Sequence, residues 1–128
     1  MPPTKKKTQT YIDVLRASSL ARIPWLAHGF STRVGGVSKV YGGRTLNLGF
    51  TSHDSRTAVD KNRREFVSAV FANTSANRKR VGRRASFPPV ANTLITVRQI
   101  HSDIIHHVST APNEALAGDG LITQTPGL

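Results

Sequence analysis

The sequence predicts an α+β fold in which mixed β-sheets are flanked by helices. Two observations carry this prediction. Residues 55–72 have the clearest helical pattern of the chain. The other apolar segments are short and are separated by glycine and polar turn residues, which is typical of strands.

The length and composition allow one compact domain, or part of one. The chain has 128 residues, of which 38% are apolar, a low fraction for a self-sufficient domain. Lysine and arginine number 18 against seven acidic residues, and the net charge of +11 favours an anionic partner such as nucleic acid or a phosphorylated metabolite. There is no cysteine, so this chain can form neither a disulfide nor a thiolate metal site.

Residues 1–10 are basic and contain few apolar side chains, which predicts a disordered tail. No apolar run of the length of a signal peptide or a membrane helix follows them. We therefore expect a cytoplasmic protein that does not contact a membrane.

The first strand candidates lie on either side of a glycine pair. An apolar stretch at residues 23–26 precedes residues 28–32, which have the pattern of a strand that enters a turn at Gly35-Gly36. The two glycines allow positive φ. Residues 45–50 are the next strand candidate.

The predicted helix, residues 55–72, can be capped by Asp54 or Ser55. Its apolar stripe consists of Val59, Phe66 and Val70, with Phe71 beside them. Arg63 lies four residues after Val59 and three before Phe66, so it belongs to the inward stripe. A guanidinium in that place must be satisfied by a carboxylate, by backbone carbonyls or by a bound anion.

Residues 73–92 are polar, basic and contain proline, which predicts a surface loop. Five cationic residues crowd into it: Arg78, Lys79, Arg80, Arg83 and Arg84. A solvated loop is the simpler interpretation, and an arm that contacts nucleic-acid phosphates is the alternative. No aromatic side chain lies among them to stack on bases.

Residues 93–101 are predicted to form a strand that places Gln99 and His101 on one face. If Ser102-Asp103 is a two-residue turn, residues 104–108 return antiparallel and bring His106 opposite Gln99. A turn at residues 118–120 then leads to a last strand at 121–123.

His101 is the main candidate for chemistry, because an imidazole at a strand end can project into a cleft while the sheet fixes its orientation. Neutral imidazole suits zinc, and a catalytic zinc site typically has three protein ligands and a water. A lone histidine at such a position is more commonly a hydrogen-bonded or solvated side chain.

Several segments occur in a distinctive order: HGFSTRVGGVS at 28–38, LNLG at 46–49, NR at 62–63, RQIH at 98–101 and GDGLIT at 118–123. Together they resemble the laccase-domain family, also called the multicopper polyphenol oxidoreductase family. The resemblance implies that residues 11–128 are the N-terminal part of a laccase-type domain, with residues 73–92 as a basic insertion. The family's later Ala-Asp-Cys and His-Ala-Gly segments, which supply two metal ligands, do not occur in this sequence, so we expect a truncated chain.

Members of that family are described as zinc-dependent purine nucleoside phosphorylases with adenosine deaminase activity. The resemblance implies that His101 is a zinc ligand and a catalytic residue. It also implies that Arg63 and Asn62 lie at the pocket for nucleoside and inorganic phosphate, and Arg33 and Asn47 are further candidates there. We expect the intact protein to cleave purine nucleosides with phosphate, and this chain alone to be inactive because it lacks the cysteine and the second histidine ligand.

Three alternatives remain. Oxidation of polyphenols with copper ranks lower, because it calls for more histidine, cysteine or methionine ligands than this segment has. A small basic nucleic-acid-binding protein is favoured by the net charge. A non-enzymatic remnant of a shortened reading frame is the third alternative.

Overall fold

The computed structural model describes residues 11–24, 26–79, 94–125 and 128, and for residues 73–79 it describes the backbone only. The predicted tail at residues 1–10 lies outside the described residues. No helix in the described part of the chain is both long enough and apolar enough to cross a membrane.

The chain divides into two compact units, Met1–Ala85 and Ser86–Leu128. Helices occur together with small sheets, and the strand pairs include antiparallel and parallel ones. The predicted α+β class is therefore confirmed.

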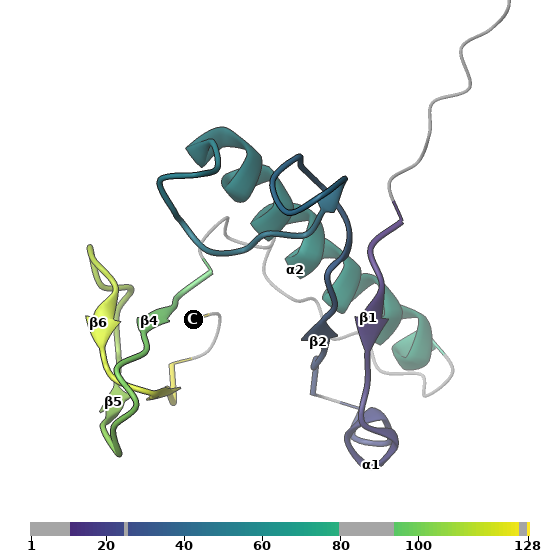
Figure 1. Ribbon diagram of the computed structural model, residues 1–128. Coiled ribbons are helices and arrows are strands. Elements are labelled where there is room, and N and C mark those ends of the chain that lie inside the picture. Colours follow the sequence, from purple (N-terminus) through teal and green to yellow (C-terminus); the bar gives the residue numbers. More distant parts are fainter. Residues whose placement is uncertain (1–10, 25, 80–93, 126–127) are drawn as a thin grey trace, which may run out of the picture. The chain divides into compact units, whose positions relative to one another are not determined.

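The first unit begins with an antiparallel pair. Strand β1 (Val14–Leu15) pairs with β2 (Phe30–Ser31), and helix α1 (Ser18–Ala21) lies in the connection between them. Figure 1 shows the two strands side by side, next to the long helix of this unit. Of the predicted strand at 28–32, only Phe30–Ser31 is a strand, and β1 and α1 were not predicted.

The glycine pair lies inside strand β3 (Val34–Ser38), so the turn predicted at Gly35-Gly36 is wrong. Both glycines nevertheless have the positive φ expected of them, 95° and 75°. A Cβ on Gly36 would lie only 2.8 Å from the Leu46 Cα and 2.7 Å from the Asn62 Oδ1. The bare backbone of Gly36 therefore lets the next loop and the long helix approach β3 closely.

The strand predicted at residues 45–50 is also wrong. Thr45 alone forms isolated bridges, with Val34 and with Ser38. Beyond it, the carbonyl oxygens of Asn47 and Leu48 accept hydrogen bonds from side chains of the long helix, not from a neighbouring strand. Side-chain donors thus replace the strand partner that the apolar pattern suggested.

The long helix α2 (Arg56–Lys79) confirms the predicted helix and continues beyond its predicted end at residue 72. Its start is capped by Ser55, whose Oγ accepts the backbone N–H of Ala58 at 3.2 Å. Val59 is fully buried and Phe66 and Val70 are half-buried, as the stripe predicted.

Since α2 includes residues 73–79, the first part of the predicted loop at 73–92 is helical. The remaining loop residues, 80–92, lie outside the described residues. So do the side chains of the basic cluster, Arg78, Lys79, Arg80, Arg83 and Arg84.

In the second unit, residues 116–122 supply the partners of two earlier strands. Strand β4 (Val97–Arg98) is parallel to β6 (Leu116–Ala117), and β5 (Ile105–His107) is parallel to β7 (Gly120–Ile122). The last strand confirms the prediction at 121–123 to within a residue. The antiparallel hairpin of residues 93–101 and 104–108 is wrong, because β4 and β5 pair with residues 116–122 and not with each other.

Candidate functional site

Asn62 links three parts of the first unit. Its side chain has no exposed surface, and its Oδ1 accepts the backbone N–H of Val37 at 2.7 Å. Its Nδ2 donates to the Ser38 Oγ at 2.8 Å and to the Asn47 carbonyl at 2.9 Å. The amide thus fastens β3 and the following loop to α2, and all of its polar atoms bond to the protein itself.

Asp54 extends this network. Its carboxylate accepts hydrogen bonds from the Ser38 hydroxyl, from the Asn47 Nδ2 at 2.8 Å and from the Ser55 backbone N–H at 2.9 Å. The bond from Ser38 and then the bond from Asn47 are the main reasons that the pKa of Asp54 is lowered, while burial opposes them. Of the two predicted caps, Ser55 therefore caps the helix and Asp54 holds the loop.

Arg63 is half-buried on the inward side of α2, as its position in the stripe predicted. Its Nε donates to the Leu48 carbonyl at 2.8 Å, and its guanidinium carbon is 4.3 Å from the centre of the Phe50 ring. Burial is the main cause that lowers the pKa of Arg63, and the charge of Asp60 opposes it. A backbone carbonyl and an aromatic ring therefore supply part of the compensation that a buried guanidinium needs.

Arg33 lies just before β3 and has an exposed side chain. Its carbonyl accepts the Leu46 N–H at 3.0 Å, which joins the start of β3 to the loop that carries Asn47. The structure thus connects Arg33, Asn47, Asn62 and Arg63 within one network of the first unit.

His101 belongs to the second unit and is exposed. Its backbone has φ 57°, the left-handed conformation that is uncommon for residues other than glycine. The Asp119 Oδ1 accepts the His101 N–H at 3.1 Å, and the Asp119 Oδ2 accepts the Ser102 hydroxyl at 2.7 Å and the Ser102 N–H. These bonds, led by that of the Ser102 hydroxyl, lower the pKa of Asp119.

The turn at residues 101 and 102, which the Asp119 carboxylate holds and which we call the Asp119 corner, explains why the predicted hairpin does not form. A carboxylate from a distant part of the chain satisfies the N–H groups at 101 and 102, so the backbone turns without a two-residue β-turn. The common face predicted for Gln99, His101 and His106 depended on that hairpin, so this prediction is wrong as well. The His106 Nε2 lies 2.8 Å from the Ala117 carbonyl and therefore acts as a donor.

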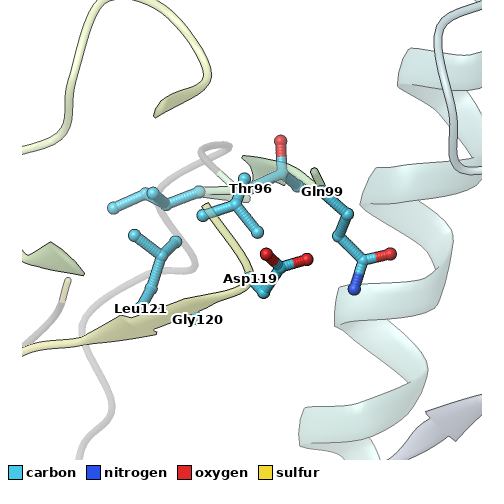
Figure 2. Close-up of a pocket in the computed structure, with 7 residues that line it drawn as sticks. Thr96, Gln99, Asp119, Gly120 and Leu121 are labelled. Carbon is cyan, nitrogen blue, oxygen red and sulfur yellow. The ribbon is translucent and has the colours of Figure 1, made fainter. Parts of the chain in front are cut away.

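An open pocket of about 440 Å³ lies beside the Asp119 corner. Figure 2 shows the Asp119 carboxylate and the Gln99 amide near one another, with Leu121 farther along the pocket. The complete lining is Ile95, Thr96, Val97, Gln99, Asp119, Gly120 and Leu121. The pocket is thus polar where it meets the corner that carries His101.

The described residues contain no group of three histidine, cysteine, aspartate or glutamate side chains that could hold a metal ion. His101 can offer one imidazole ligand. The predicted zinc centre therefore does not fit the described donor set by itself.

Sequence reasoning missed Asp54, Asp119, Phe50 and Arg56 as site residues. Asp119 stands between two glycines, which is a signal for a side chain that bonds to backbone. Phe50 gave no signal, because its contacts with Arg63 and Arg56 depend on the course of the loop before α2.

Residues 27–76 match the protein family described as multi-copper polyphenol oxidoreductase laccase. The match covers the first three of the predicted segments, at 28–38, 46–49 and 62–63, and confirms the predicted resemblance there. No curated protein matches this chain.

Proposed function

We propose that this chain provides the N-terminal part of a zinc-dependent purine nucleoside phosphorylase that also has adenosine deaminase activity. The observation that supports the proposal is the way in which the Arg63 side chain is held. Its guanidinium is held by the Leu48 carbonyl and the Phe50 ring. A fixed, partly desolvated guanidinium suits a phosphate ion, and the residue lies within the segment that matches the family.

Inorganic phosphate is the nucleophile in the proposed reaction. A phosphate oxygen forms a bond to C1′ of the nucleoside as the bond from C1′ to the purine nitrogen breaks. Arg63 binds and orients the phosphate, which lowers the entropic cost of bringing the two substrates together. Arg33, with its exposed side chain, is the second proposed contact for an anionic substrate group.

Asn62 and Asn47 have supporting roles in this proposal. Because Asn62 is fully buried and bonds to Val37, Ser38 and Asn47, it keeps the loop in the place where Leu48 meets Arg63. Direct contact between Asn62 and a substrate would require those bonds to open. His101 is the proposed single zinc ligand from this chain, and the other ligands have to come from elsewhere.

Equilibrium binding of inosine and phosphate to the chain tests the proposal. We expect wild type and an R64Q control to bind phosphate similarly, since Arg64 is exposed on the same helix, and R63Q to bind it more weakly. Phosphate-dependent release of hypoxanthine should be slight for the zinc-equilibrated chain. Rapid turnover by this chain would contradict the incomplete metal centre, and a chain that does not bind inosine would contradict the function.

Nucleic-acid binding is the second candidate, and the net charge of +11 favours it. Titration of a fluorescent duplex at increasing salt separates the two candidates. A steep loss of duplex affinity with salt, together with no affinity for inosine, would select nucleic-acid binding.

A further inference from the structure

Phe50 contacts two arginine side chains. The guanidinium carbon of Arg56 is 4.7 Å from the centre of the Phe50 ring, and that of Arg63 is 4.3 Å from the same point. Both distances lie within the range of a favourable contact between a cation and an aromatic ring. Arg56 and Arg63 are about two helical turns apart on α2, so they lie on one side of the helix. The ring therefore gathers two positive charges at one place.

These charges lack a matching carboxylate pair. Burial is the main cause that lowers the pKa of Arg63; the charge of Asp60 raises it, and the charge of Arg56, a smaller effect, lowers it, which reflects repulsion between the two guanidinium groups. Among the side chains that the structure describes, the ion pair found joins Lys61 and Glu65 and includes neither arginine. An anion between the two guanidinium groups would relieve this repulsion.

The arginines also have hydrogen-bond donors to offer. Arg63 uses its Nε on the Leu48 carbonyl, and within the described part of the chain its two Nη groups have no hydrogen-bond acceptor. Arg56 is exposed, and Phe50 is 45% exposed, so solvent reaches the cluster. Planar guanidinium groups with free N–H donors match the oxygen atoms of a tetrahedral anion.

We propose that Phe50 holds Arg56 and Arg63 as a paired site for a phosphate dianion, in which Arg56 supplies the second guanidinium. The choice of inorganic phosphate rests on the proposed function, whereas the pairing rests on the geometry at Phe50. Stacking on the ring limits the motion of both long side chains before the anion arrives, which reduces the entropic cost of binding.

Calorimetric titration of inorganic phosphate into the full chain at low ionic strength, without zinc or nucleoside, tests the site. Wild type should bind one phosphate, and R56Q should bind it about tenfold more weakly, the usual value of one hydrogen bond to a charged group. R64Q removes the same charge from an exposed position of the same helix and should change the affinity little. Circular dichroism verifies that each variant keeps its helix.

Two further variants test the role of the ring and the shape of the cation. F50L should weaken phosphate binding although it leaves both charges in place, and R56K should fall between wild type and R56Q, because an ammonium lacks the planar donor pair. Equal weakening by R56Q and R64Q would mean that net charge alone matters and would overturn the proposal. A wild-type chain that binds no phosphate would overturn it too.

Further outcomes test the chemical identity of the phosphate ligand and distinguish failure of the proposed function from failure of the paired site. A nucleoside monophosphate that binds much more tightly than inorganic phosphate would overturn inorganic phosphate as the ligand. If R56Q loses phosphate binding and inosine does not bind to any form of the chain, the proposed function fails and the paired site stands. If inosine and phosphate bind but R56Q behaves like wild type, the paired site fails alone.

Discussion

The Asp119 carboxylate accepts the backbone N–H of His101, although the two residues belong to separate turns of the second unit. The same carboxylate binds the N–H and the hydroxyl of Ser102. One side chain thus fixes the only described histidine with positive φ. The unusual backbone of His101 is imposed by a specific partner, which is the condition under which such strain persists at functional sites.

Replacement of Asp119 by asparagine should release this corner. The amide Nδ2 of the variant would face the donors of Ser102, because an asparagine offers one acceptor oxygen where the carboxylate offers two. We expect the coupling constant between the His101 amide and α protons, measured by NMR, to move toward values of negative φ, and the melting temperature to fall.

The control for this variant is D103N, which makes the same chemical change at an exposed position two residues after His101. It should leave the coupling constant of His101 unchanged. An unaltered coupling constant in D119N would show that other contacts set the corner.

Acid should destabilise the protein through Asp54 and Asp119. The pKa of each carboxyl is lowered in the folded state from the ordinary value of 3.8, mainly by hydrogen bonds from Ser38 and from Ser102 respectively. Between the lowered pKa values and 3.8, the unfolded chain therefore binds more protons than the folded protein. The stabilisation is complete above pH 3.8 and is lost as the pH falls through the lowered pKa values.

Urea denaturation at a series of pH values measures this effect. The urea concentration at the unfolding midpoint of the wild type should decrease when the pH is lowered below 3.8. D54N and D119N should each show a smaller decrease, because each variant lacks one carboxyl group whose protonation is linked to unfolding. A drop of equal size in wild type and both variants would assign the acid sensitivity to other groups.

Asn62 should be required for stability rather than for ligand contact alone. Asn62→Leu is similar in size but leaves the Val37 N–H and the Asn47 carbonyl without their buried partner. An unsatisfied buried group costs about 1–3 kcal/mol, so the free energy of unfolding should fall by at least that amount. Ser68→Ala, at an exposed position of the same helix, serves as the control and should have little effect.

Gly36 and Gly42 offer a matched pair, because both have positive φ, 75° and 84°, but different surroundings. A Cβ on Gly42 meets nothing within 4 Å, so Gly42→Ala carries only the backbone cost, about 1–2 kcal/mol. Gly36→Ala adds close contacts with the Thr45 carbonyl, the Leu46 Cα and the Asn62 Oδ1. Equilibrium unfolding in urea should therefore show the larger loss for Gly36→Ala, and equal losses would refute the close approach.

The local features of the fold could be predicted from the sequence. The helix, its cap at Ser55 and the inward position of Arg63 follow from residue spacing within one element, and the structure has all three. The positive φ of the glycine pair was predicted as well, since glycine is the residue that tolerates it.

The remaining features depend on partners that are distant in the chain. The hairpin at residues 93–108 was expected from alternation alone, whereas the bonds of Asp119 to residues 101 and 102 decide the actual course. Likewise, the two arginines meet at Phe50 only because the loop before α2 brings the ring there. Alternation and spacing contain no information on such contacts.

The segment from Leu116 to Ile122 is the shared strand partner of β4 and β5. Neither strand has another partner within the described residues. The strand pairs of β4 and β5 therefore cannot form before residues 116–122 have been synthesised. The second unit, unlike the pair of β1 and β2 in the first, can complete its sheets only after translation has passed residue 122.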